Sequence, residues 1–230
     1  MSRAPTPSAS TSPAAAYQRD WWSDDSRYRS AEHPISRIYA EGKVAFLDRH
    51  LPLPEGSSIL DVGTGNGTMF VPLAARHRLV GIDTSPDLLR RHVDRARVAM
   101  ASVLELPFAD RSFDLVICSC LLHHVDDRAR AVREMARVAR RAVDLIEPNR
   151  WNPLQTLFSA LVPAERGGLD FHTGYLRRLL DGAGLDVRAT SAWGMTFPNK
   201  LPLSLGPVAR RLERALPMGN VCLAIATRRE

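Results

Sequence analysis

The amino-acid sequence predicts an α/β fold built on a mostly parallel sheet, and three observations support this prediction. From residue 58 to residue 147, short apolar runs typical of buried strands alternate with segments of helical periodicity. A glycine-rich turn follows the first of these runs. The chain has 230 residues, of which 45% are apolar. A chain of this length can bury one full hydrophobic core but is too short for two domains of ordinary size. We therefore expect a single α/β domain with additional segments.

The predicted core begins after a helical segment. Residues 35–47 carry apolar side chains at helical spacing, which predicts a helix. Pro52 and Pro54 then interrupt the chain, because proline cannot continue a regular helix. Residues 58–62 form an apolar run that predicts the first buried strand.

A regular alternation follows this first strand. Ser85 stands at the start of one helical segment, where its hydroxyl can cap the helix. The pattern predicts helices at 69–76, 86–96 and 128–139, and strands at 79–82, 98–101, 113–119 and 142–147.

The last third departs from this alternation. Residues 173–183 predict a helix that ends at Gly184, a residue suited to a helix C-terminus. Residues 185–191 and 221–227 predict two closing strands, separated by a long proline-containing segment with a helix near 207–216. The seven predicted strands and the helices between them indicate one sheet with helices on both faces.

Composition divides the chain into three regions. Residues 1–16 are mostly Ser, Thr, Pro and Ala, which predicts a disordered tail. Residues 17–55 predict an N-terminal helical cap, and residues 56–230 the α/β domain. Within that domain, the segments near 149–172 and 192–219 are long enough to predict lid insertions.

Charge and cysteine content exclude several classes of protein. The net charge of +6 comes from arginines scattered along helices, so it does not by itself predict nucleic-acid binding. Three cysteines fit neither a disulfide framework nor a zinc-binding spacing, and we expect no metal. No apolar stretch is long enough to span a membrane, and we expect a cytoplasmic protein.

The glycine-rich turn predicts a nucleotide-binding site. Residues 59–67 lead from a buried strand into three closely spaced glycines, where backbone N–H groups can face a ligand. Asp83 ends the next strand, 20 residues after Gly63. A carboxylate at this spacing can reach a pair of ribose hydroxyls. We therefore expect an adenosine-containing ligand.

Details of the turn favour S-adenosylmethionine over NAD. The dinucleotide fingerprint needs a glycine three residues after Gly65, and Thr68 occupies that position. The third glycine is instead Gly67. Asp61 would repel a pyrophosphate but attract a cationic amino group. The motif thus predicts a Rossmann-like sheet that binds a positively charged adenosine derivative.

In these residues the chain resembles the class I S-adenosylmethionine-dependent methyltransferases, especially the group that includes quinone-biosynthesis and other small-molecule methyltransferases. The resemblance covers roughly residues 58–148. It rests on four blocks that occur in the order of the family: 60–67; 80–86; 106–108 with 112–116; and 121–125 with 134–138.

The resemblance implies a set of cofactor-binding residues. Asp61 and the glycine loop would hold the methionine end, and Asp83 the ribose. The chain departs from the family at Ser102, where Asp is common, and at Arg140-Arg141-Ala142, where the family has Pro-Gly-Gly. The predicted cofactor contacts are Asp61, Gly63, Thr64, Gly65, Asn66, Gly67, Asp83, Thr84, Ser102, Val103, Cys118 and Ser119.

Methyl transfer requires mainly that donor and acceptor be held in line, so few side chains need to take part in the chemistry. His123 and His124 follow the fourth strand and are the candidate catalytic bases. They can equally cap the next helix or pack against the cofactor. Cys118 and Cys120 are more typical of buried small residues than of nucleophiles.

Aromatic residues outside the cofactor blocks predict an acceptor pocket for a small apolar or aromatic metabolite. Ordinary core packing is the alternative for each of them. Two other functions remain open: a nucleic-acid methyltransferase, for which the sequence shows neither grouped basic residues nor a recognition domain, and a cofactor-binding protein without methyl transfer, such as a cyclase. The aromatic group comprises Trp21, Trp22, Tyr28, Tyr39, Trp151, Phe158, Phe171, His172, Tyr175, Trp193 and Phe197.

Overall fold

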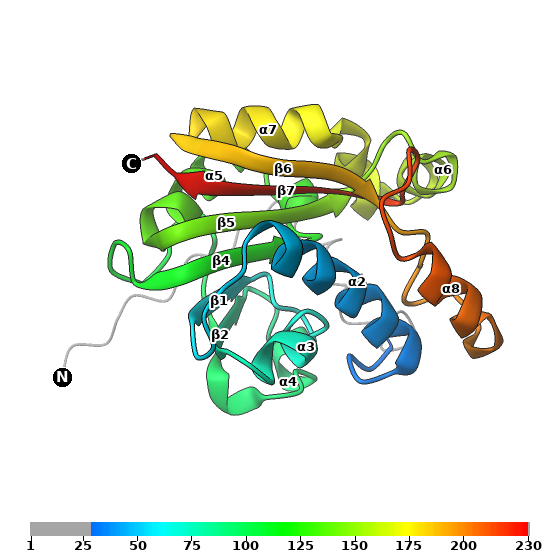
Figure 1. The fold of residues 1–230 in the computed structure, drawn as a ribbon, viewed down its shortest axis with the longest axis horizontal. Helices are drawn as coiled ribbons and strands as arrows, with labels where there is room; N and C mark the ends of the chain where they lie inside the picture. Colours follow the sequence, from blue (N-terminus) through cyan, green and yellow to red (C-terminus); the bar gives the residue numbers. More distant parts are fainter. Residues whose placement is uncertain (1–28, 230) are drawn as a thin grey trace.

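The computed structural model describes residues 29–229, which form one seven-stranded sheet in the order β3-β2-β1-β4-β5-β7-β6 (Figure 1). All neighbouring strands are parallel except those that pair with β7, which runs antiparallel to both β5 and β6. The predicted α/β fold is confirmed. The strands are β1 (Ser58–Val62), β2 (Arg78–Asp83), β3 (Val98–Met100), β4 (Phe113–Ser119), β5 (Ala139–Pro148), β6 (Leu185–Trp193) and β7 (Val221–Arg228).

The strand order reverses next to β1. The chain runs outward from β1 to β2 and β3, and then returns to place β4 on the other side of β1. β1 therefore pairs in parallel with both β2 and β4. In open parallel sheets, ligands bind at the carboxyl ends of the strands where the order reverses. This topology places the candidate site beside the ends of β1, β2 and β4.

Alternate residues of the central strands face two hydrophobic layers. Leu60 and Val116 pack into the layer that contains α5 and α7. Ile59 and Leu115 pack into the opposite layer with α2 and α3. Because both faces are buried, the central strands are mostly apolar, as expected for a parallel sheet. The helices of these layers are α2 (Pro34–His50), α3 (Phe70–Ala74), α5 (Arg128–Val138) and α7 (Thr173–Gly182).

Helices that leave the regular alternation gather near the carboxyl ends of the parallel strands. Figure 1 shows α2 crossing in front of the sheet, with α6 and α8 beyond the strand ends. α6 (Pro153–Leu161) and the 3₁₀ segment η4 (Pro163–Asp170) follow β5 directly, and α8 (Gly206–Leu212) follows β6 and packs against α2. These segments coincide with the predicted insertions at 149–172 and 192–219.

The predicted helix at 86–96 is wrong in its second half. α4 spans only Pro86–Arg90, and a short 3₁₀ turn, η2, follows at Arg95–Arg97. The chain leaves the helix because His92 folds back onto the glycine loop, where its Nε2 lies 3.0 Å from the hydroxyl of Thr64. The backbone of Val93 also donates to the carbonyl of Asn66. A tertiary contact thus overrides the local helical pattern.

The helix predicted at 35–47 is present in the structure as α2. Its N-terminus is capped by His33, with Pro34 at the first helical position. The predicted tail at 1–16, the first part of the predicted cap, and the aromatics Trp21, Trp22 and Tyr28 lie outside the described residues. Among the described residues, no helix has the length and apolar character needed to cross a membrane.

Candidate functional site

The glycine loop lies where β1 ends beside β2. Gly63, Gly65 and Gly67 all have positive φ, at 71°, 55° and 92°. Such values strongly favour glycine over residues with a Cβ atom. The loop is held to the sheet because the N–H groups of Gly63 and Thr64 both donate to the carbonyl of Ile82. The structure therefore forms the glycine-rich turn that the sequence predicts.

Asp61 is a buried carboxylate at the start of this loop. It is 1% exposed, and its Oδ2 accepts a hydrogen bond from the hydroxyl of Thr64 at 2.8 Å. Burial raises the pKa of Asp61 to about 7, and the nearby Asp83 adds to this, while the Thr64 hydrogen bond opposes it. A cation placed beside Asp61 would stabilise its ionised form.

Asp83 connects the glycine loop to the start of α4. Its Oδ2 accepts from the N–H of Gly65 at 3.0 Å, and its Oδ1 accepts from the N–H of Ser85 at 2.8 Å. Burial raises the pKa of Asp83, and these backbone hydrogen bonds oppose the increase. The carboxylate is thereby held in a fixed orientation at the end of β2, where the resemblance places the ribose.

The other predicted cofactor residues lie at the same edge or in the adjoining core. Thr84 is exposed beside Asp83, and Ser102 follows β3, which pairs with the end of β2. Val103 and Cys118 are buried in the core, and Ser119 is half-buried at the end of β4. Burial raises the pKa of the Cys118 thiol well above its usual value. This favours a small packing residue over a nucleophile.

Glu147 organises the turn that follows β4. This residue lies in β5 and is fully buried, and its Oε1 accepts from the backbone N–H groups of Leu121 and Leu122. Its Oε2 lies 2.7 Å from Nδ1 of His123. The turn also contains Cys120 in a left-handed conformation with φ of 53°. One carboxylate thus fixes three successive residues at the strand end.

His123 and His124 are adjacent but differ in charge. Burial lowers the pKa of His123, but Glu147 and Glu165 outweigh it and raise the pKa to about 9. Burial and the charge of His123 lower the pKa of His124 well below its usual value. At neutral pH, His123 is therefore protonated and His124 is neutral.

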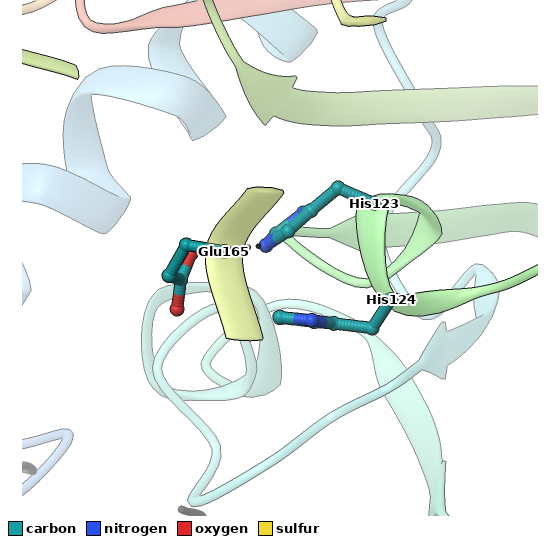
Figure 2. A group of neighbouring side chains, drawn as sticks. All are labelled: His123, His124 and Glu165. Carbon is teal, nitrogen blue, oxygen red and sulfur yellow. Dashed lines mark ion pairs between the residues drawn. The ribbon is translucent and has the colours of Figure 1, made fainter. Parts of the chain in front are cut away.

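The two histidines lie beside an acidic residue from η4. Their ring centroids lie 3.8 Å apart, and the ring planes are tilted by 45°. Nε2 of His123 lies 3.3 Å from Oε2 of Glu165. Figure 2 shows both imidazoles projecting from the turn after β4 toward the η4 segment that carries Glu165. The structure thus brings together the two predicted histidines and a carboxylate that was not predicted.

A second buried cluster joins α2 to the end of β4. The hydroxyl of Tyr39 lies 3.6 Å from Sγ of Cys120. Nζ of Lys43 lies 3.5 Å from the centroid of the Tyr39 ring and 2.7 Å from Oε2 of Glu213. Of these residues only Tyr39 and Cys120 were singled out from the sequence. The cluster thus packs α2 against the turn that follows β4.

Two of the missed residues had a signal in the sequence. Glu147 ends a mostly apolar run of the predicted strand at 142–147, and an acid at the end of a buried strand is unusual enough to predict a role. Lys43 lies between Tyr39 and Leu47 at four-residue spacing, on the apolar face of its helix. Glu165 and Glu213 had no such signal, because each reaches its partner only through the tertiary fold.

The predicted aromatic group is divided among three environments. Trp193 packs edge-on against Phe46 in one core layer, and Phe171 packs against Tyr175 in the other. Trp151 is 62% exposed. Its ring centroid is 6.2 Å from that of His172. Phe158 on α6 is 37% exposed, Phe197 is half-buried, and Tyr39 is buried beside Cys120.

The sheet order, the glycine loop and the two carboxylates together define the Rossmann-like fold of S-adenosylmethionine-dependent methyltransferases. Solved structures have a similar fold. The fold is similar to that of a methyltransferase from Thermotoga maritima, with a TM-score of 0.64, 21% identity and coverage of 85% of this chain and 92% of the other. A methyltransferase from Archaeoglobus fulgidus gives a TM-score of 0.61 at 18% identity, with coverage of 82% and 94%.

Sequence comparisons agree with this class. Residues 60–146 match the family model of a methyltransferase domain. The chain is 38% identical over 131 residues to 27-O-demethylrifamycin SV methyltransferase of Amycolatopsis mediterranei, covering 52% of this chain and 46% of that protein. It is 35% identical over 156 residues to ubiquinone biosynthesis O-methyltransferase of Hahella chejuensis, covering 63% and 62%.

The matched region thus spans about half to three-fifths of the length of these relatives. Residues 60–146 therefore match a methyltransferase domain, and the sheet as a whole has the fold seen in solved methyltransferases.

Proposed function

We propose that the protein transfers a methyl group from S-adenosylmethionine to a small apolar or aromatic metabolite. The observation that carries the proposal is the placement of Asp61, a buried carboxylate, directly before three glycines with positive φ and within the same loop network as Asp83. This arrangement offers an anionic group for a cationic amino group, and a second carboxylate for ribose hydroxyls.

The residues fit the cofactor in shape as well as in charge. A Cβ atom at Gly65 would meet nothing within 4 Å, so the space in front of the loop is open. Gly63 instead packs against Leu121, where a Cβ atom would lie 2.8 Å from a side-chain carbon. The backbone at Gly65 therefore faces open space, whereas the backbone at Gly63 packs against Leu121.

The bound cofactor supplies an electrophilic methyl group, so the protein needs chiefly to position the acceptor and exclude water. The buried cluster of Tyr39, Lys43 and Cys120 lies at the end of β4, beside the predicted cofactor site. Trp151 and Phe158 extend an apolar surface from the segment after β5. These groups support an apolar or aromatic acceptor.

An acceptor hydroxyl would have to lose its proton during transfer. His123 is already protonated at neutral pH because of its two carboxylate neighbours. His124 is neutral at that pH and is the better base of the predicted pair. We therefore assign proton removal to His124 in the absence of any bound cation.

Two further observations support a small acceptor. The two similar proteins are a demethylrifamycin methyltransferase and an O-methyltransferase of ubiquinone biosynthesis. Several surface arginines are engaged in ion pairs, which gives no support to a continuous basic face for nucleic acid. Examples are Arg128 with Asp170, Arg137 with Asp110 and Glu134, and Arg140 with Asp114.

Isothermal titration with S-adenosylmethionine, S-adenosylhomocysteine and NAD tests cofactor binding without a known acceptor. We expect dissociation constants on the order of micromolar for the two sulfur compounds and no binding of NAD. Binding of NAD alone would overturn the proposal.

A turnover assay with a panel of quinols, phenols and short oligonucleotides then tests methyl transfer, with S-adenosylhomocysteine release as the readout. Release with a phenol or quinol supports the proposal, and release only with an oligonucleotide contradicts it. Tight cofactor binding without release in any reaction would instead identify a protein that does not transfer the methyl group.

A further inference from the structure

We propose that His123, His124 and Glu165 form a binding site for a divalent transition-metal ion such as Zn²⁺. Each residue offers one ligand atom, and these atoms all lie within 4.8 Å of one another. The three side chains come from two segments, η3 (Leu122–His124) and η4, which the fold places side by side (Figure 2). The inference goes beyond the proposed function, because metal binding requires neither cofactor nor acceptor.

The ligand set matches the chemistry of such ions. Imidazole nitrogen and carboxylate oxygen are both preferred ligands of Zn²⁺, at about 2.0–2.2 Å. Two ligands at this distance and at a tetrahedral angle are about 3.4 Å apart. Nε2 of His123 and Oε2 of Glu165 are separated by 3.3 Å. This pair is therefore already spaced for a shared ion.

The carboxylate of Glu165 can complete the site by a small movement. Its side chain is 12% exposed, whereas that of His123 is 2% exposed. The glutamate is therefore the less confined of these two ligands. In Figure 2 the two imidazoles project in the same direction from one turn, so one carboxylate can reach between them.

Glu147 gives this site the support that metal-binding histidines usually have. A histidine ligand commonly donates its second ring N–H to a carboxylate, which fixes the ring and leaves the other nitrogen free for the metal. Oε2 of Glu147 lies 2.7 Å from Nδ1 of His123, while Nε2 faces Glu165. Glu147 is itself held by two backbone N–H groups. It would act as a positioning residue.

The surrounding charge also suits a cation. The ion would displace one proton from His123, which leaves two neutral histidines and one carboxylate with a charge of −1, and Glu147 adds a second negative charge. Arg128 is a neighbouring cation, but its Nη1 lies 2.7 Å from Asp170, and its guanidinium lies over the ring of Phe171. Its charge is therefore partly neutralised. Three protein ligands leave a coordination position for water or for an oxygen atom of a ligand.

Titration of the full-length, tag-free protein with Co²⁺ after chelator treatment tests this site. Visible absorption bands report the geometry of Co²⁺, and isothermal titration with Zn²⁺ gives the stoichiometry. We expect one ion per chain and no ultraviolet charge-transfer band from cysteine thiolate. A thiolate band would assign the ion to cysteine ligands and overturn the proposal, as would the absence of saturable binding.

Substitutions then locate the ion. Glu165→Gln and His124→Asn should each weaken Co²⁺ binding at least about tenfold, and Glu147→Gln should weaken it about 10- to 100-fold. His50→Asn, at the end of α2, is the matched control and should bind as the unmodified protein does. Circular dichroism confirms that each variant is folded. Unchanged affinity in folded Glu165→Gln and His124→Asn would refute the assignment.

Discussion

Nζ of Lys43 lies 2.7 Å from Oε2 of Glu213, with 1% and 3% of the two side chains exposed. This ion pair joins α2 to the segment after α8. Removing one partner of a buried pair leaves an uncompensated charge. We expect Lys43→Met to reduce the free energy of unfolding by about 3–5 kcal/mol, as measured by urea denaturation.

A matched pair of controls distinguishes lost charge pairing from lost packing. The double variant Lys43→Met with Glu213→Gln removes both charges and should recover much of the loss. Arg76 and Asp48 form a surface ion pair whose side chains are 42% and 41% exposed. Arg76→Ala should therefore change stability by less than about 1 kcal/mol. Equal losses in the single and double variants would contradict the charge argument.

Binding of S-adenosylmethionine should weaken as the pH falls below 7. Burial raises the pKa of Asp61 to about 7, so the carboxylate gains a proton between pH 7 and pH 6. Only the ionised form attracts the amino group of the ligand. The dissociation constant should therefore rise about fivefold between pH 7 and pH 6. Isothermal titration at the two pH values measures this change.

Asp61→Asn provides the control for this pH dependence. The amide is close in size to the protonated acid but cannot ionise. The variant should bind more weakly at pH 7 and show little change between pH 7 and pH 6. If the unmodified protein binds equally well at both pH values, Asp61 does not pair with the amino group.

The stability of the fold should depend on Asp144, a buried acid in the centre of β5. Burial alone raises its pKa to about 8, and its Oδ1 has no hydrogen-bond partner among the described residues. The folded protein therefore favours the neutral acid, whereas the unfolded chain ionises near the usual value. The contribution of Asp144 to stability is complete at pH below about 4 and is lost as the pH rises toward 8.

Asp144→Asn removes this titration. Relative to the unmodified protein, the variant should gain about 2–4 kcal/mol in unfolding free energy between pH 5 and pH 8. Urea denaturation of both proteins at the two pH values measures the difference. A constant difference across this range would show that Asp144 does not titrate as its burial implies.

Local patterns were sufficient to predict most of the sheet. The strands at 58–62 and 113–119 are bounded in the structure as the apolar runs indicate, because their residues face buried layers on both sides. The prediction of a helix at 86–96 was wrong in its second half because His92 turns the chain onto Thr64. No local pattern encodes this contact. Sequence reasoning therefore succeeded where burial alone determines the structure.

The same distinction applies to the candidate site. Asp61, the glycine loop and Asp83 were predicted because the strand–turn–strand spacing brings them together within one local unit. Glu165 was not predicted, because it lies 42 positions from His123 in the sequence and approaches it only through the packing of η4. Lys43 and Glu213 are 170 positions apart. Such contacts depend on how the inserted segments pack against the sheet, which their composition does not specify.

Gly63 and Gly65 should respond differently to substitution by alanine. Both have positive φ, so a Cβ atom strains the backbone by about 1–2 kcal/mol at either position. At Gly63 the added Cβ atom would also lie 2.8 Å from the side chain of Leu121, whereas at Gly65 it would meet nothing within 4 Å. Gly63→Ala should therefore cause the larger loss of stability, and it should also displace Leu121 from the turn after β4.

Gly65→Ala should instead affect ligand binding more than folding. The space in front of Gly65 is the space that we assign to the cofactor, so a methyl group there would obstruct it. We expect a decrease in melting temperature smaller than that of Gly63→Ala, together with a loss of S-adenosylmethionine affinity of at least about tenfold, or about 1.4 kcal/mol. Thermal denaturation and isothermal titration of the two variants measure both effects. If Gly65→Ala binds normally, the cofactor does not approach the loop at this residue.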